Sequence, residues 1–182
     1  MRTITFASTN QNKFLEVQSI LSIWNISVDF LQTRLVEVQS DTLEEIAKEK
    51  AKTAFAKVGR PVIVEDDGLF IDSLGGFPGQ YSSFTFKTIG NGGILKLLAG
   101  SANRSAYFRS VIAFHDGRTL SISEGRVDGR ISDRITEDGW GYDPIFMPAG
   151  IDLTFAQLKK SKNEYSHRKR ALEKFARWYL KL

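Results

Sequence analysis

The sequence predicts a mixed α/β fold, because short β-branched segments alternate with longer amphipathic segments along its 182 residues. A further observation is the Asp-Gly turn in "HDGRT" (115–119), which lies between two alternating apolar runs and is typical of an antiparallel hairpin. The pattern predicts strands at 3–7, 26–31, 62–71, 106–114 and 119–127. It predicts helices at 11–24, 42–58, 93–98 and 167–180.

The composition limits the classes of protein to consider. With 42% hydrophobic content, the chain is long enough for a single domain, residues 1–182, or for two lobes that share a sheet, with a sizeable core. It contains no cysteine, which excludes disulfides, thiolate metal sites and cysteine nucleophiles, so any metal must be bound by oxygen or by the two histidines. No signal-type segment starts the chain and no apolar run approaches the ~20 residues of a membrane span, so we expect a cytoplasmic protein.

The charge is unevenly distributed along the chain. The net charge is +4, and the segment 159–182 holds nine Lys and Arg residues against two Glu. A basic block of this kind suits a polyanionic ligand, either a nucleotide or a nucleic acid. The alternative to a ligand-binding role is that this basic segment forms a solvated helix face, which would have the same composition.

The segment "STNQNK" (8–13) joins the first predicted strand to the first predicted helix. A helix N-terminus presents free backbone N–H groups and the positive end of the helix dipole, so such a junction can bind an anion. Ser8 and Asn10 add hydrogen-bonding groups, and Lys13 adds a positive charge in the first turn, which together favour a phosphate. The alternative is that Thr9 or Asn10 caps the helix and that Lys13 is solvated.

The predicted helix 42–58 carries a lysine on its apolar side. At ~100° per residue, Lys50 falls within the apolar stripe of this helix. A lysine that points inward needs an anion unless its side chain can reach solvent, so Lys50 is a second candidate phosphate ligand. Asp41 and Glu44 are the expected capping pair, and Gly59 is expected to end the helix.

Three carboxylates follow a predicted buried strand in "VEDDGLF" (64–70). Glu65, Asp66 and Asp67 repel one another when they are ionised, and a divalent cation would relieve this repulsion. With oxygen ligands and phosphates nearby, the expected ion is Mg²⁺, with Mn²⁺ as a substitute. Glu37, which precedes the second helix, is a further candidate ligand. A solvated acidic turn is the alternative for the three carboxylates.

Two segments in the last third of the chain suggest a site for a nucleotide base. "GWGYDPIF" (139–146) would expose Trp140 and Tyr142 as faces on which a purine could stack, whereas packing within a turn is the structural alternative. "SKNEYSHRKRAL" (161–172) leads into the last helix, where Arg168 extends the apolar stripe by one turn and His167 lies beside it. An arginine on the core side needs either a ligand or a carboxylate at the edge of the core.

Together, "STNQNK", "LEEIAKEKA", "VEDDGLFIDSLGGFPGQYSSF", "GWGYDPIF" and "SKNEYSHRKRAL" resemble the inosine triphosphate pyrophosphatase family across nearly the whole chain. The resemblance implies hydrolysis of deaminated purine nucleoside triphosphates (ITP, dITP and XTP) to the monophosphate and pyrophosphate. It also implies Mg²⁺ dependence, a homodimer, and an α/β fold in which a long mixed β-sheet links two lobes around a central cleft. Neither nucleic acid nor a membrane is an expected partner.

The resemblance also assigns roles to individual residues by motif. Asp66 is the implied general base, and Glu37, Glu65 and Asp66 are the implied metal ligands. Trp140 corresponds to the aromatic residue that stacks on the base. The implied substrate-binding set is Ser8, Asn10, Lys13, Lys50, Asp67, Trp140, Tyr142, Asp143, Lys162, Ser166, His167 and Arg168.

One position departs from the family pattern. After "PGQY", some relatives have a basic residue where this chain has Ser82, Ser83 and Phe84. The corresponding substrate contact is therefore not expected here, unless Lys87 replaces it.

The expected mechanism follows from charge. Lysines and Mg²⁺ neutralise the triphosphate so that water, activated by Asp66, can attack the α-phosphorus. A pyrophosphatase for modified pyrimidine nucleotides would use the same metal chemistry, but a purine-sized site with the segment 166–168 argues against it. A basic nucleic-acid-binding module would suit the net charge, but the acids at 65–67 would repel a phosphate backbone.

Overall fold

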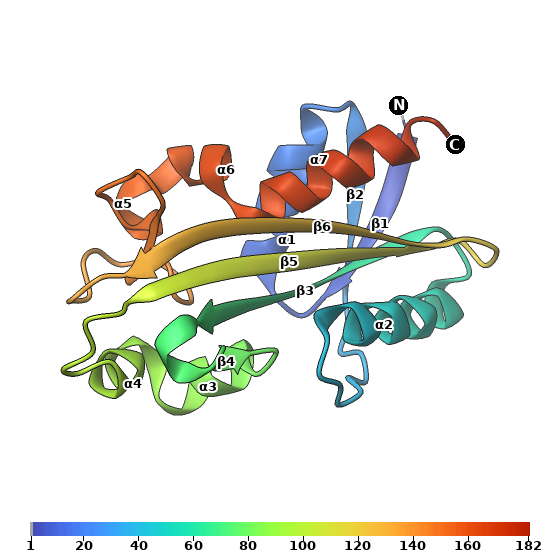
Figure 1. Cartoon of the computed structure of the whole chain (residues 1–182). Coiled ribbons are helices and arrows are strands. Elements are labelled where there is room, and N and C mark those ends of the chain that lie inside the picture. The colour runs from blue at the N-terminus through green and yellow to red at the C-terminus, as the bar shows by residue number, and fades with distance from the viewer. Residues whose placement is uncertain (1) are drawn as a thin grey trace. The chain divides into compact units, whose positions relative to one another are not determined.

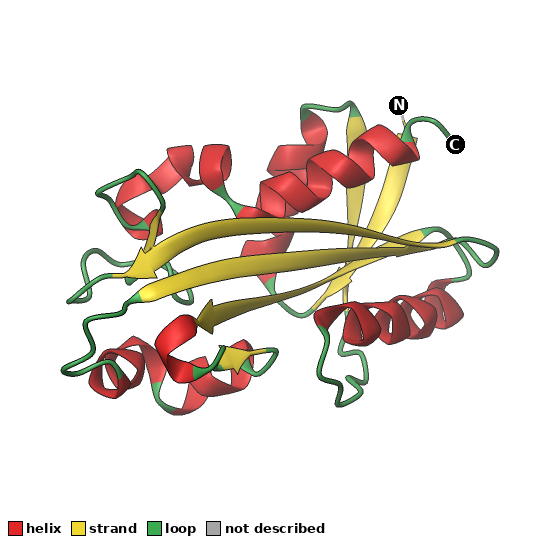
Figure 2. Ribbon diagram, viewed as in Figure 1, coloured by secondary structure: helices red, strands yellow, loops and turns green. Residues whose placement is uncertain are grey.

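The structure is a computed structural model that describes residues 2–182 (Figures 1 and 2). A mixed seven-stranded sheet has the order β2–β1–β3–β5–β6–β7, and β4 pairs with β3 outside this path. The chain divides into two compact units, which we describe separately. Unit 1 comprises the chain up to Asp66, Ser110–Gly125 and His167–Leu182, and unit 2 comprises Asp67–Arg109 and Arg126–Ser166. The predicted mixed α/β class is confirmed.

Unit 1 contains the parallel strands of the sheet. β1 (Arg2–Ser8) pairs in parallel with β2 (Ile26–Gln32) and with the first half of β3 (Val62–Ile71). The connections between these strands contain α1 (Gln11–Ser22) and α2 (Leu43–Val58), as parallel strands require a crossover.

A hairpin adds two long strands, β5 (Ser105–His115) and β6 (Leu120–Ile131). The Asp-Gly turn between them is formed as predicted: Asp116 Oδ1 accepts hydrogen bonds from the N–H groups of Arg118 and Thr119, at 2.9 and 2.7 Å. Gly117 has a φ of 93°, which glycine adopts without strain.

Helices cover both faces of the strands in unit 1. Ile4, Phe6 and Ile63 belong to a core that also contains the apolar side of α1 and of α7 (His167–Tyr179). The residues between them in the strands are buried as well, and Figure 1 shows α2 on the other side of these strands from α1 and α7. Both faces of β1 and β3 are therefore shielded from water in this unit, as is usual for parallel strands.

Unit 2 is built around a second core, in which the rings of Phe108 and Phe146 meet edge to face with centroids 4.7 Å apart. Its antiparallel pairs are β3 with β4, where Leu69 is opposite Gly79, and β6 with β7, where Ile131 is opposite Phe146. The short elements of unit 2 are the strands β4 (Pro78–Gly79) and β7 (Phe146–Pro148), the α-helices α3 (Ser82–Thr88), α4 (Gly90–Leu97), α5 (Phe155–Leu158) and α6 (Lys162–Tyr165), and the 3₁₀ turns Asp72–Leu74 and Lys159–Ser161.

The predicted elements are confirmed with small shifts in their ends, and the strand 62–71 is reproduced. The predicted cap of α2 is wrong: Thr42 is the N-cap and accepts from the N–H of Glu45, while Gly59 ends the helix in the left-handed conformation, as predicted. The sequence analysis did not predict β4, β7, α3, α5 and α6, most of which are too short to show a periodic pattern. Within residues 2–182, no helix combines the length and the apolar character needed to cross a membrane.

Candidate active site

The junction between β1 and α1 is a capped helix start. Asn10 Oδ1 accepts from the N–H of Lys13 at 3.1 Å, and Ser8 Oγ accepts from the N–H of Asn10 at 3.1 Å. The capping alternative is therefore confirmed for Asn10. The Lys13 side chain is only partly exposed, and its Nζ lies 3.7 Å from Glu65 Oε2. A fixed positive charge thus lies at the positive end of α1.

A buried network of charges surrounds Arg168. Its Nε lies 2.8 and 2.9 Å from the two carboxylate oxygens of Glu65, and its Nη1 bonds to Glu16. Ser110 donates to Glu65 Oε1 at 2.7 Å. The side chains of Arg168 and Glu65 are 0% exposed, and each charge is neutralised by the other.

The contacts in this network differ from the roles predicted for Arg168 and Glu65. Arg168 has the carboxylate partners that the sequence analysis gave as the alternative to a ligand, and its side chain has no exposed surface with which to reach a base. Glu65 is a poor candidate for direct metal binding, because both of its oxygens already accept from Arg168. Both side chains are desolvated, so each needs the opposite charge of the other as a partner.

Lys50 joins two of the predicted acidic residues. It is buried as predicted, with 8% of its surface exposed, and its Nζ lies 2.7 Å from Glu37 Oε1 and 2.8 Å from Asp66 Oδ2. Burial raises the pKa of the Asp66 carboxyl group to about 6, although the positive charges of Lys50 and Lys13 oppose this increase. Asp66 can therefore gain or lose a proton near neutral pH, as a general base must.

The raised pKa predicts how Asp66 affects stability in the absence of metal. Its pKa in the folded protein is about 6 and its ordinary value is 3.8, so the folded state binds the proton more tightly. The contribution of Asp66 to the free energy of unfolding should then fall as the pH rises from about 4 to about 6, by about 3 kcal/mol. In EDTA, Asp66→Asn should match the parent near pH 4 and exceed its stability by about this amount at pH 8.

Urea unfolding at the two pH values measures this difference, since the other titrating groups are common to both proteins. Equal stability of the parent and Asp66→Asn at pH 8 would show that Asp66 is not desolvated in the folded protein.

Two of the three predicted metal ligands, Glu37 and Asp66, lie close together around Lys50. Within residues 2–182 no three His, Asp or Glu side chains are grouped as a complete metal site. Glu37 and Asp66, however, converge on the same ammonium group, and Asp66 is desolvated. Mg²⁺ commonly binds one or two carboxylates and completes its coordination with water and substrate phosphates, so Glu37 and Asp66 would suffice.

In unit 2, three of the residues predicted to bind the base lie together. Lys162 Nζ lies 2.7 Å from Asp143 Oδ2 and 4.7 Å from the centre of the Trp140 ring. The Asp143 carbonyl also accepts from the N–H of Ala156 at 3.1 Å. Lys162 and Asp143 are both buried, so their ion pair is held firmly in place. Because Lys162 begins α6, the pair keeps the segment that carries Trp140 and Asp143 close to this helix.

Tyr142 is not exposed, contrary to the expectation for this segment. It is 5% exposed, its hydroxyl donates to the Ser82 carbonyl at 2.9 Å, and its ring meets Phe86 edge to face with centroids 5.4 Å apart. Burial raises the pKa of the Tyr142 hydroxyl. The packing alternative therefore holds for Tyr142, and its hydroxyl is already used within the protein.

The remaining predicted residues fall in both units. Asp67 is half-buried on β3 and Ser166 is fully buried after α6, both in unit 2. His167 is buried at the start of α7 in unit 1. Ser82 is one of the three residues found where some relatives have a basic residue. It is buried and its hydroxyl donates to the Gly79 carbonyl at 2.6 Å, so it has a structural role.

Sequence reasoning missed four residues that support these groups. Glu16 lies one helical turn after Lys13, and this spacing could have suggested that it faces the same way. Ser110 and Ser82 are small polar residues without a distinctive pattern. Asn91 lies in α4 and contacts a segment 50 residues away, which no local signal could reveal.

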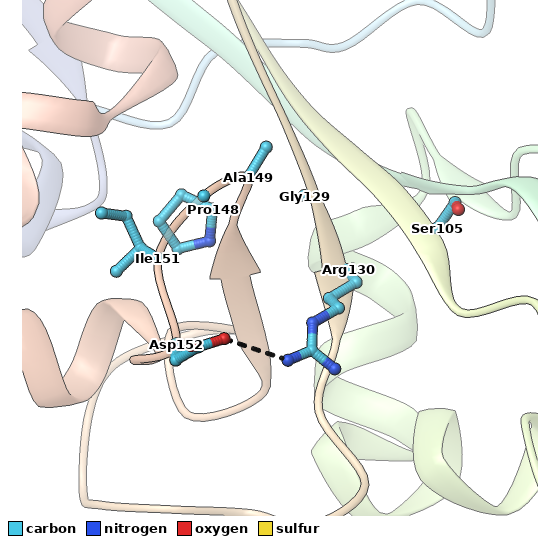
Figure 3. Close-up of a pocket in the computed structure, with 8 residues that line it drawn as sticks. Ser105, Gly129, Arg130, Pro148, Ala149, Ile151 and Asp152 are labelled. Atoms are coloured by element: carbon cyan, nitrogen blue, oxygen red, sulfur yellow. Dashed lines mark ion pairs between the residues drawn. The ribbon is translucent and has the colours of Figure 1, made fainter.

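Unit 2 also has an open cavity of about 370 Å³ (Figure 3). Arg130 and Asp152 form an exposed ion pair at its edge, with 3.5 Å between Nη2 and Oδ1. None of the predicted site residues lines this cavity. The lining residues are Ser105, Gly129, Arg130, Pro148, Ala149, Gly150, Ile151 and Asp152.

Comparison with known proteins identifies the family. The sequence profile of the Ham1 family matches residues 4–178. The chain belongs to the Ham1 family. It is 48% identical to a protein of Methanopyrus kandleri named dITP/XTP pyrophosphatase, over 97% of this chain and 95% of that protein. A protein of Saccharolobus solfataricus with the same name is 46% identical, over 93% of this chain and 89% of that protein.

Solved structures of the Ham1 family have the same fold. A HAM1 protein from Coxiella burnetii superimposes with a TM-score of 0.86 at 31% identity, covering 100% of both chains. The Staphylococcus aureus Ham1 protein gives a TM-score of 0.84 at 30% identity, covering 98% of both chains. These comparisons confirm the family resemblance that was drawn from the five sequence motifs.

Proposed function

We propose that this Ham1-family chain hydrolyses the deaminated purine nucleoside triphosphates ITP, dITP and XTP to the monophosphate and pyrophosphate. The observation that carries the proposal is the 46–48% identity, over nearly the full length, to relatives named dITP/XTP pyrophosphatase. The charged groups of unit 1 support it, because they combine cations for phosphate binding with a carboxylate that titrates near neutral pH.

The triphosphate is assigned to the cations of unit 1. Lys13 lies at the positive end of α1, where backbone dipole and side-chain charge attract the same anion. Lys50 is already held between Glu37 and Asp66, so its charge is in a fixed position before substrate arrives. Such preorganised charge stabilises the additional negative charge that develops on the phosphate oxygens during attack.

Asp66 is the proposed general base. As a carboxylate it can accept a proton from the attacking water, while Lys50 stabilises its ionised form. Mg²⁺, held by Glu37 and Asp66, would supply Lewis-acid neutralisation of the phosphate oxygens when bound. Glu65 has a different role, since it neutralises Arg168 and lies within 4 Å of the Lys13 ammonium group.

The base is assigned to the Trp140 group of unit 2. The half-buried ring of Trp140 offers a stacking face, and Lys162 is a donor that cannot accept a hydrogen bond. Hypoxanthine and xanthine carry a carbonyl at position 6 and can accept from such a donor. Adenine carries an amino group there and would meet it donor to donor, which favours the deaminated bases.

We further propose that the protein works as a homodimer in the cytoplasm. The family resemblance suggests the dimer, and Phe77, Tyr81 and Phe84, which are 40–67% exposed, give unit 2 an apolar surface that a partner could cover. Light scattering at micromolar concentration, with Phe84→Ser as the variant, measures whether this surface holds a second copy.

The test of the proposed function is the fate of heavy oxygen from labelled water. With ITP and Mg²⁺, the products should be inosine monophosphate and pyrophosphate, and the label should appear in the monophosphate, because attack occurs at the α-phosphorus. Label in the pyrophosphate would place the attack at the β-phosphorus, and release of inorganic phosphate would indicate a different reaction. A set of modified pyrimidine triphosphates under the same conditions tests the alternative substrate class.

A further inference from the structure

The loop 139–143, which carries Trp140 and Asp143, has a glycine at its centre. Gly141 has a φ of 61°, in the left-handed region. No atom outside its chain neighbours lies within 4 Å of the position that a Cβ would occupy. Packing of surrounding atoms therefore does not hold Gly141 in this conformation. Trp140 is the residue immediately before it.

The C-terminal half of the loop is fixed by its own contacts. The Asp143 carboxylate is bound by Lys162, and the Tyr142 hydroxyl by the Ser82 carbonyl. Ser82 is itself fixed, since its Oγ accepts from the N–H of Leu69 at 2.8 Å. A turn hydrogen bond from the N–H of Asp143 to the Trp140 carbonyl, at 3.3 Å, also spans Gly141 and Tyr142, but none of these contacts binds the Gly141 carbonyl itself.

Asn91 supplies the contact to this carbonyl. It lies in the first turn of α4, and its Nδ2 donates to the Gly141 carbonyl at 3.0 Å. Its Oδ1 is buried and has no hydrogen-bond partner within residues 2–182, so the bond to Gly141 is what orients the amide. A donor on a helix, bonded to the carbonyl of the loop glycine, restrains the backbone that carries the preceding Trp140 side chain.

We propose that Asn91 is a positioning residue for base binding. It holds the Gly141 carbonyl in place and thereby sets the direction of the Trp140 ring. The inference rests on the proposed function, in which Trp140 stacks on the base. Asn91 belongs to unit 2, whereas the residues assigned to the phosphates belong to unit 1. Its removal should therefore weaken binding that depends on the base and leave phosphate binding intact. This separates it from a residue that merely stabilises the fold.

The test compares Asn91→Ala with Asn91→Leu, which keeps a branched side chain of similar size but has no donor. Both should raise KM for ITP about five- to tenfold, the usual effect of losing one hydrogen bond to a partly buried carbonyl, with kcat within about twofold of the parent. The inhibition constant of tripolyphosphate, which has no base, should not change. Asn103→Ala is the matched control, because it removes an asparagine side chain that bonds to the Ser105 backbone elsewhere in unit 2.

The outcomes separate the inference from the proposed function on which it rests. An unchanged KM for ITP in both variants, or an equal rise in the tripolyphosphate inhibition constant, would overturn the role of Asn91. Trp140→Ala, measured in parallel, should raise KM for ITP at least as much; no effect there would overturn the base site and the inference together. A parent that does not hydrolyse ITP would overturn the proposed function itself.

Discussion

Asp66→Asn should lower kcat for ITP by about 10²-fold or more while the protein remains folded. The amide cannot accept a proton from water, and it is a weaker ligand for a metal ion than a carboxylate. The substitution removes a desolvated charge, so folding should not suffer. Steady-state kinetics with saturating Mg²⁺, together with circular dichroism of the same preparation, measure the two effects.

Asp72→Asn is the matched control, since Asp72 is exposed on the 3₁₀ turn that follows β3. It should leave kcat unchanged. If Asp66→Asn keeps kcat within a few-fold of the parent, the general base is another group, and Glu37 is the next carboxylate to test because it shares the Lys50 ammonium group.

The sequence predicted most of the fold, because the long elements carry strong periodic signals. Lys50 shows this clearly: its position on the apolar side of the helix 42–58 was enough to predict that it is buried. The sequence predicted a phosphate as its partner, and the structure shows the carboxylates of Glu37 and Asp66 there. The short elements of unit 2 could not be found in this way. Their positions depend on contacts such as that between Tyr142 and Ser82, which are far apart in the sequence.

In the candidate site, too, local sequence patterns could be read, whereas contacts between distant residues could not. The sequence showed that Arg168 points toward the core, but not whether a ligand or a carboxylate neutralises it. Glu65 and Glu16 lie 103 and 152 residues away along the chain, and only the folded structure brings these carboxylates to the guanidinium group. Tyr142 failed as a prediction for a related reason, because glycines on both sides suggested exposure while distant residues bury the ring.

Arg168→Met should lower the free energy of unfolding by about 3–5 kcal/mol at pH 7, because it leaves the fully buried Glu65 and its neighbour Glu16 without their shared cation. Methionine keeps much of the volume, so loss of packing contributes little. Urea unfolding measures the change. Arg168→Met combined with Glu65→Gln should recover a large part of the loss, since the second substitution removes the uncompensated charge.

The kinetic part of the same experiment separates this structural role from base reading. If Arg168 serves the ion network, the specificity constants for ITP and ATP should fall by similar factors, and their ratio should stay constant. If Arg168 instead donates to the base, the ratio should fall about tenfold or more while the stability changes little. The buried position of the guanidinium, with both Glu65 oxygens on its Nε, leads us to expect the first result. A large fall in the ratio would return Arg168 to the base site.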